Sequence, residues 1–193
     1  MPRPAKFSED LILDAATAVV ARHGTGATIA QVATELGAPV GSLYYRFASR
    51  EALMVSLWVR SIRRFQQGLL AAAAEEDPDR ALTESALHVP RFCRAHPDVA
   101  ATLVLFRHDV AVRTAPESIR AEVVALNDPM LALQADLIRR RWGRVTPTRT
   151  RLVGIALRQS PYGLVRPYVG GVVPVWLDDV VEAATAGILG LVR

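Results

Sequence analysis

Cysteine and long apolar runs are scarce in this sequence of 193 residues. Cys93 is the single cysteine, which excludes an intramolecular disulfide framework and is typical of a reducing compartment. No uncharged apolar run approaches the ~20 residues that a membrane span needs. Glu9 and Asp10 precede any apolar block, so no signal peptide is evident. We therefore expect a cytoplasmic protein with no membrane association.

Motifs that carry catalysis are also missing. The sequence has no glycine-rich phosphate loop after a strand, no nucleophile elbow and no zinc-protease helix motif. His108 and Asp109 are neighbours that point about 100° apart on a helix, so they do not form a base with its orienting acid. We expect neither an enzyme nor a bound cofactor.

Candidate metal ligands are few. They are His88, Cys93, His96 and His108, of which Cys93 and His96 lie one helical turn apart. Soft nitrogen and sulfur ligands of this kind suit zinc or copper. No carboxylate or second cysteine completes the set, and we predict no metal site.

Positive charge is concentrated toward the N-terminus. Residues 1–64 contain eight Lys and Arg against five Asp and Glu, whereas the remaining residues contain fifteen against fourteen. A surplus of this kind favours a polyanionic partner.

The stretch from Thr28 to Leu53 carries the clearest pattern. Apolar residues recur at helical spacing at Ile29, Val32, Ala33 and Leu36. Thr28 stands at the position of an N-cap, and Gly37 at that of a C-cap, where glycine reaches positive φ at little cost. The pattern predicts a short helix between these two residues.

A second short helix is expected directly after it. Pro39 suits the first turn of a helix, and Leu43 and Phe47 supply its buried side. Ser49 is the expected N-cap of a third helix. Two short helices joined by a tight glycine turn form a helix-turn-helix, whose second helix can lie in the DNA major groove.

The identities of the residues add to this pattern. Together with Ile12, Ala15, Ala16 and Gly24 upstream, the run IA-Q-VA followed by LGAP-GSLYYRF-SREAL resembles the DNA-binding domain of the TetR family of bacterial transcriptional regulators. The resemblance implies an all-α fold with two domains. Residues 1–50 would form a three-helix helix-turn-helix DNA-binding domain, and residues 51–193 a helical ligand-binding and dimerisation domain.

Nine residues are candidate DNA contacts: Arg3, Lys6, Thr28, Val40, Gly41, Ser42, Tyr44, Tyr45 and Arg50. The resemblance implies base contacts from 40–42 and a phosphate contact from the Tyr44 hydroxyl. Tyr45 either makes one of these contacts or packs against the first helix. Thr28 and Arg50 lie at helix N-termini, which attract phosphate.

The two remaining contacts belong to a short basic arm, which either reaches a phosphate or the minor groove or is disordered. Val40 departs from the family, because many members carry a polar or basic residue there. Specificity then leans more on Ser42, Tyr45 and DNA shape.

Beyond residue 49 the apolar pattern predicts helices only. We expect them over residues 49–74, 79–96 with a kink at Pro90, 97–106, 116–142 with a bend near Pro129, 146–162 and 175–191. Val99–Phe106 is apolar on nearly every face, as in a helix in the middle of a domain. The connection 163–174 is rich in Val, Gly and Pro, and its apolar character suggests cover by packing, including packing by a partner chain.

The last helix carries small residues that allow another helix to approach closely, namely Ala183, Ala186, Gly187 and Gly190. The family resemblance implies that the last two helices pair with their copies as a four-helix bundle. A two-fold homodimer would place two recognition helices one DNA turn, ~34–36 Å, or a multiple apart on double-stranded DNA. The expected operator is therefore palindromic.

A ligand pocket in the second domain is a further implication of the resemblance. The apolar candidates for its lining, each of which also suits a core, are Trp58, Ile62, Phe65, Phe92, Leu103, Phe106, Leu126, Met130 and Tyr162. The resemblance implies a repressor released from its operator by a small apolar or amphipathic effector. The alternatives are a metal-sensing regulator of the same fold and a helical protein-interaction module without DNA binding.

Overall fold

The computed structural model describes residues 7–192 of the chain. Over this range the regular elements are helices and no strand occurs, which confirms the all-α class. None of these helices combines the length and the apolar character that a membrane crossing requires. Packing divides the described chain into two compact units. Unit 1 holds the residues up to Ile62 together with Asp98–Leu126, and unit 2 holds Arg63–Pro97 and the residues from Asn127 onward.

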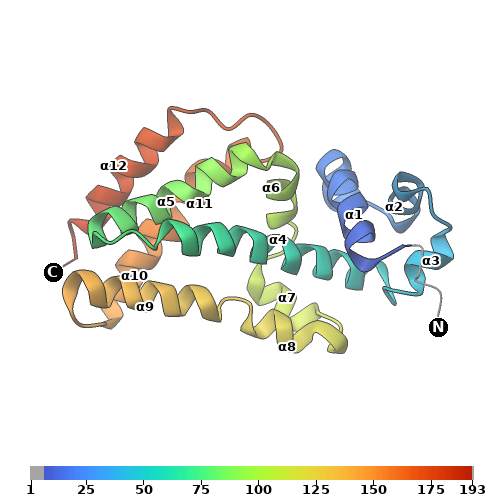
Figure 1. The fold of residues 1–193 in the computed structure, drawn as a ribbon, viewed down its shortest axis with the longest axis horizontal. Helices are drawn as coiled ribbons and strands as arrows, with labels where there is room; N and C mark the ends of the chain where they lie inside the picture. Colours follow the sequence, from blue (N-terminus) through green and yellow to red (C-terminus); the bar gives the residue numbers. More distant parts are fainter. Residues whose placement is uncertain (1–6, 193) are drawn as a thin grey trace. The chain divides into compact units, whose positions relative to one another are not determined.

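Unit 1 contains the predicted helix-turn-helix (Figure 1). Its helices are α1 (Glu9–His23), α2 (Ile29–Leu36), α3 (Val40–Tyr44), the first part of α4 (Arg50–Ala72), α6 (Pro97–Leu103), α7 (His108–Thr114) and α8 (Glu117–Ala125). A completely buried core joins the first four of these helices and includes Ile12, Val32, Leu43 and Leu57.

Local capping interactions fix the ends of these helices, as the sequence predicts. The Thr28 hydroxyl accepts a hydrogen bond from the Gln31 N–H at 3.2 Å, and the Gln31 side chain accepts one from the Thr28 N–H at 2.9 Å. Gly37 ends α2 with φ of 64° in the left-handed region, where a side chain would be strained. Ser49 caps α4 by accepting from the Ala52 N–H at 3.1 Å. These contacts confirm the three predicted caps.

The helices α6 to α8 pack in unit 1, against the first part of α4. Trp58 and Val123 belong to the apolar core between them, and the Trp58 indole donates a hydrogen bond to the Leu103 carbonyl at 3.2 Å. The expectation of an all-round buried helix through Phe106 is wrong, because α6 ends at Leu103 and the Val104 side chain is 40% exposed. The sequence pattern also missed α7.

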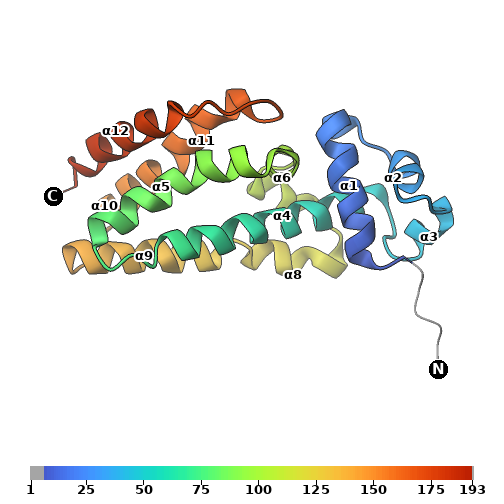
Figure 2. The ribbon, with the colours of Figure 1, turned by 45° about the horizontal axis from the view of Figure 1, so that its top comes forward.

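Unit 2 is a second helical layer arrangement. It contains the remainder of α4, α5 (Pro78–Ala95), α9 (Asp128–Trp142), α10 (Pro147–Gly154), a π-helical segment (Ile155–Gln159), α11 (Ser160–Val165), a 3-10 turn (Arg166–Tyr168) and α12 (Leu177–Leu189). Figure 2 shows α5 lying between α12 on one side and α9 on the other. Leu82, Leu137 and Val181, which are completely buried, join these three helices into one core.

Two expected helices are divided in the structure. The predicted helix 116–142 is two helices, α8 and α9, separated at Leu126 and Asn127. Pro129 lies in the first turn of α9, where its missing N–H would have no intrahelical partner, so it begins a helix instead of bending one. By contrast, α5 continues through Pro90. The predicted helix 146–162 is interrupted by the π-helical segment.

Arginine side chains hold the ends of elements in unit 2. Arg94 pairs with the Asp178 carboxylate at 2.7 Å and donates to the carbonyls of Val173 and Pro174 at 3.1 and 2.9 Å. The connection before α12 is therefore tied to α5. Arg140 of α9 donates to the carbonyls of Ala73, Glu75 and Glu76, which follow the end of α4.

Close packing of α4 and α5 depends on a glycine. The His88 ring lies against Gly68, and a Cβ on that glycine would overlap His88 Cε1. His88 Nε2 lies 2.9 Å from the Phe65 carbonyl oxygen. Its ring also packs against the rings of Phe65 and Phe92, with centroids 4.8 and 5.5 Å away. The imidazole is thus fixed on three sides.

Burial lowers the pKa of His88 below its ordinary 6.5, helped by the neighbouring His96, while the hydrogen bond to Phe65 acts in the opposite direction. Because the unfolded state binds more protons below about pH 6.5, the contribution of this residue to stability is complete above that pH and is lost as the pH falls through the folded-state pKa.

Replacing His88 by glutamine should therefore reduce the loss of stability on acidification. The measurement is the free energy of unfolding in urea at about pH 7.5 and about pH 5, on either side of the ordinary histidine pKa. An equal loss in the wild type and in His88→Gln would contradict this role.

Candidate nucleic-acid interface

The short helix α3 divides its side chains between the core and solvent, as predicted. Leu43 is completely buried and Phe47, just after the helix, is nearly so. Val40, Tyr44 and Tyr45 are exposed, Tyr45 most of all at 82%. Gly41 is also exposed, and Ser42 is half-buried. The exposed face is therefore apolar at its start and aromatic at its end.

Tyr45 makes no close packing with the first helix. Its exposed ring lies beside the Arg46 guanidinium, whose central carbon is 5.7 Å from the ring centroid. Of the two alternatives for Tyr45, burial against α1 is thus excluded, while a DNA contact stays a prediction.

Arg46 is a candidate that the sequence interpretation left out. It lies between the inward-facing Leu43 and Phe47, and its side chain is exposed. Helical spacing places residue 46 on the solvent side whenever 43 and 47 face the core, so the signal was present in the sequence.

Thr28 and Arg50 are occupied within the domain. The Thr28 hydroxyl belongs to the capping box of α2. Arg50 donates from Nε to the Ala27 carbonyl at 2.7 Å and from Nη2 to the Thr25 carbonyl at 2.5 Å. These bonds fix the start of α4 against the turn that precedes α2. A phosphate contact by either residue stays a prediction, and replacing Arg50 would disturb the domain as well as any such contact.

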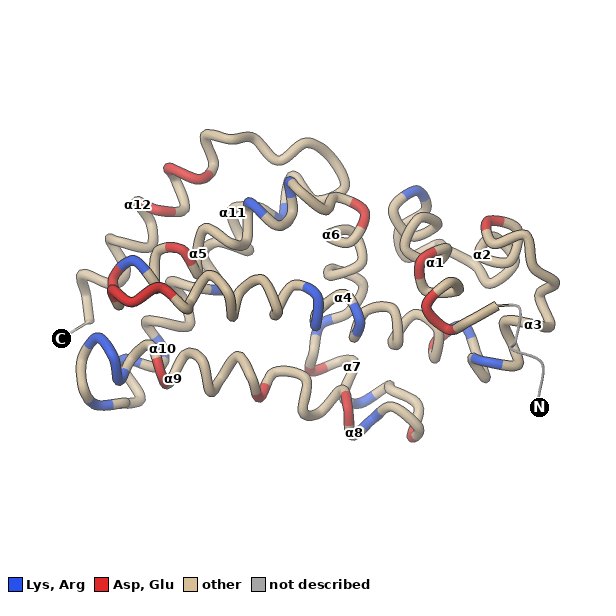
Figure 3. The backbone as a smooth tube through the Cα atoms, viewed as in Figure 1, with Lys and Arg blue, Asp and Glu red and all other residues tan. Residues whose placement is uncertain are grey.

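The positive surplus of the N-terminal part does not lie on the helix-turn-helix itself. Residues 7–53 contain three arginines against five acidic residues, and Figure 3 shows few charged residues on α2 and α3. Arg22 pairs with Glu35. The other basic residues of this part are Arg60, Arg63, Arg64 and the arm residues Arg3 and Lys6.

Arg3 and Lys6 lie outside the described residues. Within the described domain, the side chains available for a polyanion are mainly the tyrosines of α3 and Arg46.

The candidate metal ligands have other surroundings. His88 and His108 each have Nε2 within 2.9 Å of a backbone carbonyl oxygen, those of Phe65 and Val123. Burial raises the pKa of the Cys93 thiol to about 11, so it remains protonated and is a poor metal ligand near neutral pH. Among residues 7–192, no three His, Cys, Asp or Glu side chains are grouped to hold a metal ion.

The nine ligand candidates fall into both units. Trp58, Ile62, Leu103, Phe106 and Leu126 lie in unit 1, and Phe65, Phe92, Met130 and Tyr162 lie in unit 2. Trp58 and Leu126 belong to the core of unit 1, whereas Tyr162 is 44% exposed. Their role in ligand binding stays a prediction.

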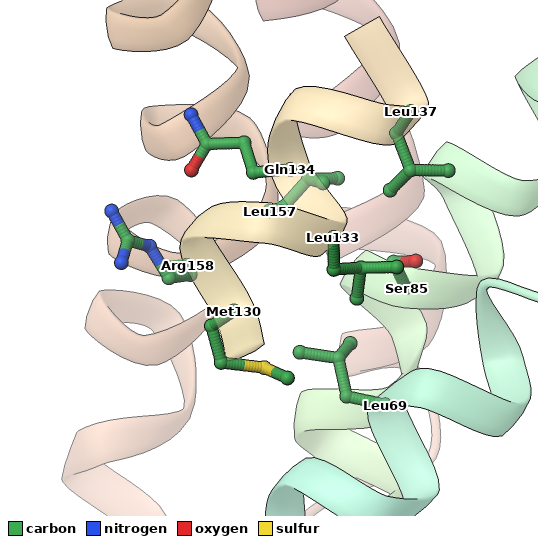
Figure 4. A pocket seen from close by; sticks show the side chains of 8 residues that line it. All are labelled: Leu69, Ser85, Met130, Leu133, Gln134, Leu137, Leu157 and Arg158. Carbon is green, nitrogen blue, oxygen red and sulfur yellow. The ribbon is translucent and has the colours of Figure 1, made fainter. Parts of the chain in front are cut away.

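Met130 does line a cavity inside unit 2. Its other lining side chains come from α4, α5, α9 and the π-helical segment: Leu69, Ser85, Leu133, Gln134, Leu137, Leu157 and Arg158. Figure 4 shows the amide of Gln134 and the guanidinium of Arg158 on one side of this cavity, away from Leu69 and Leu133. Its volume of about 20 Å³ is enough for about one water molecule.

Comparison with known proteins relates this geometry to one family. Residues 12–57 match the model of the bacterial regulatory proteins of the tetR family. No match was found among curated proteins. The matched segment contains α2, α3 and most of the buried core around them.

Solved structures extend the similarity of fold over the chain. A transcriptional regulator from Rhodococcus sp. Rha1 has a TM-score of 0.74 at 19% identity, covering 95% of this chain and 97% of its own. The TetR family transcriptional regulator PfmR from Thermus thermophilus has a TM-score of 0.71 at 19% identity, covering 94% and 98%. FadR from Bacillus subtilis, solved in complex with stearoyl-CoA, has a TM-score of 0.60 at 16% identity, covering 95% and 97%.

The helix-turn-helix geometry and the family match concern the same residues, and the fold similarity covers nearly the whole chain. This chain therefore carries the N-terminal DNA-binding domain of the TetR family and has the fold of TetR-family transcriptional regulators.

Proposed function

We propose that the protein is a sequence-specific DNA-binding repressor whose hold on a palindromic operator is released by a small amphipathic molecule. The observation that carries this proposal is the face of α3, which exposes Val40, Gly41, Tyr44 and Tyr45 on a domain whose caps and core fix the helix. Small side chains near the start of the helix allow the backbone to approach base edges, and the two tyrosines supply hydroxyl donors for phosphates.

The proposed mechanism of release is a population shift. A ligand lowers affinity for the operator when it binds more tightly to a conformation whose recognition helices have the wrong spacing. The similarity in fold to FadR, which was solved with stearoyl-CoA, supports an amphipathic effector. Two half-sites about one DNA turn or a multiple apart are expected from a two-fold dimer.

Selection of bound duplexes from a random DNA pool tests the proposal directly. We expect enrichment of an inverted repeat, because a two-fold dimer reads the same half-site twice. Recovery of no sequence preference, together with no retention on DNA at low salt, would contradict DNA-specific regulation and favour a helical interaction module.

Arg46 provides a residue-level test of the interface. Arg46→Gln should weaken binding to the selected operator and to unrelated duplexes alike, and should reduce the slope of log affinity against log salt by about 0.9, the value for one phosphate contact. The measurement is fluorescence anisotropy over a series of salt concentrations. Arg113→Gln is the control, because Arg113 lies on α7 of the same unit and pairs with Asp109. An unchanged slope in Arg46→Gln would remove Arg46 from the phosphate contacts.

A further inference from the structure

A second concave feature of unit 2 is an open groove between α9 and α10. Its volume is about 610 Å³, within the range of about 300–1,000 Å³ that is usual for small-molecule sites. Leu131 and Gln134 of α9 line one side, and Thr150, Arg151, Arg158 and Gln159 line the other. No acidic side chain lines this groove.

Two guanidinium groups of the groove have no partner. Among residues 7–192, neither Arg151 nor Arg158 forms an ion pair or hydrogen bond through its side chain. Other arginines of unit 2 are engaged, as Arg94 is with Asp178 and Arg141 with Asp79. Two unpaired positive charges on one concave surface favour an anion, which a guanidinium holds by charge-assisted hydrogen bonds.

Gln134 and Gly154 shape the floor of the groove. Gln134 is 6% exposed, and its amide nitrogen donates to the Thr150 carbonyl at 2.5 Å, which fixes the side chain. A Cβ on Gly154 would lie 3.3 Å from Arg158 Nη2 and 3.4 Å from Gln134 Nε2. The missing side chain of Gly154 therefore leaves the space in which these two polar end groups converge.

The groove adjoins the apolar cavity that Met130 lines. Gln134 and Arg158 line both the groove and the cavity, and the remaining walls of the cavity are mainly apolar. Figure 4 shows how the polar ends of these two side chains mark one side of the cavity. Met130 is unbranched and flexible, so it can yield to an apolar chain more easily than a branched residue.

The π-helical segment contributes to both features. It supplies Leu157 to the cavity, Gln159 to the groove, and Arg158 to both. Single turns of π-helix are uncommon and are found frequently at functional sites, because the additional residue redirects neighbouring side chains.

We propose that the groove binds the head group of an amphipathic anion, a carboxylate or phosphate ester, through Arg158 and Arg151. The apolar chain of that molecule enters between Gln134 and Arg158 and enlarges the cavity by displacing Met130. This assignment rests on the proposed function only for the consequence at the operator, since it names the chemical class of the effector.

Binding of decyl phosphate to the full chain without DNA tests this assignment. Isothermal titration below the micelle concentration should show one molecule per chain, with decanoate as the second head group and decanol as the neutral control. We expect Arg158→Gln to weaken decyl phosphate binding about tenfold or more, as for loss of a charge-assisted hydrogen bond, and Arg151→Gln to weaken it less. Arg166→Gln, an exposed arginine outside the groove, should bind as the wild type does.

Three results would overturn the assignment. Decanol binding as tightly as decyl phosphate would exclude the charged head, and inorganic phosphate binding as tightly would exclude the apolar chain. Unchanged affinity in Arg158→Gln, with circular dichroism showing the same fold, would exclude the groove. Because no DNA is present, failure here leaves the operator selection untouched, and failure of that selection leaves this binding measurement untouched.

Discussion

Gly187→Arg should convert a dimeric protein into a folded monomer that no longer holds its operator. Gly187 lies on an exposed stripe of α12 that also contains Val180, Ala183 and Leu191, spaced three or four residues apart. The stripe is apolar and has small residues at its centre, as a face that packs against the same helix of a second copy requires. A guanidinium placed there would lose water in the dimer without gaining a partner.

The substitution should leave the single chain intact. A Cβ on Gly187 meets no atom within 4 Å, and arginine favours a helix more than glycine by up to about 1 kcal/mol. Light scattering after gel filtration should give half the mass of the wild type. Affinity for a two-half-site operator should fall at least about 100-fold, because the second half-site is no longer bound by a linked copy.

Ala132→Arg is the matched control. Ala132 is also an exposed small residue within a helix of unit 2, but it lies on α9, which packs on the other side of α5 from α12 (Figure 2). This variant should remain dimeric. A dimer of unchanged mass in Gly187→Arg would show that α12 does not form the interface.

Gly68→Ala should destabilise the protein although alanine is the better helix former. The new methyl group would overlap His88 Cε1, and the ring cannot retreat easily because the Phe65 carbonyl and the rings of Phe65 and Phe92 hold it. Overpacking of this kind costs about 1–3 kcal/mol, against a gain of up to about 1 kcal/mol in helix propensity. We expect a lower midpoint of urea unfolding.

A double-mutant cycle separates the clash from other effects. In a His88→Ala background the obstacle is gone, so Gly68→Ala should there be neutral or stabilising. Gly41→Ala is the control for propensity alone, because a Cβ at Gly41 meets no atom within 4 Å. Equal destabilisation by Gly68→Ala in both backgrounds would show that His88 is not the cause.

The parts of the fold that the sequence predicts well are those fixed by local chemistry. Thr28, Gly37 and Ser49 cap helices through contacts no more than three or four residues away, and Leu43 and Phe47 face the core by helical spacing alone. Because these interactions are short-range, residue types at fixed offsets are enough to predict them.

Longer-range features escaped prediction for physical reasons. The break between α8 and α9 occurs where Pro129 can either bend a helix or begin one, and only the packing around Leu126 decides between these. Arg50 reads as a free cation at a helix start, yet its partners are backbone carbonyls more than twenty residues earlier. Backbone carbonyls carry no residue-type signal, so such bonds are invisible in a sequence.

The composition of unit 1 bears on how such a regulator can be taken apart and rebuilt. Its core uses Leu53, Met54 and Leu57 from α4, beyond the expected boundary at residue 50, and its second core uses Val123 from α8. The unit is discontinuous in sequence, since the chain leaves it after Ile62 and returns at Asp98. A chimaera that joins this DNA reader to a foreign sensor therefore needs two junctions, one near Ile62 and one near Asp98, and a single cut after the recognition helix would divide a core.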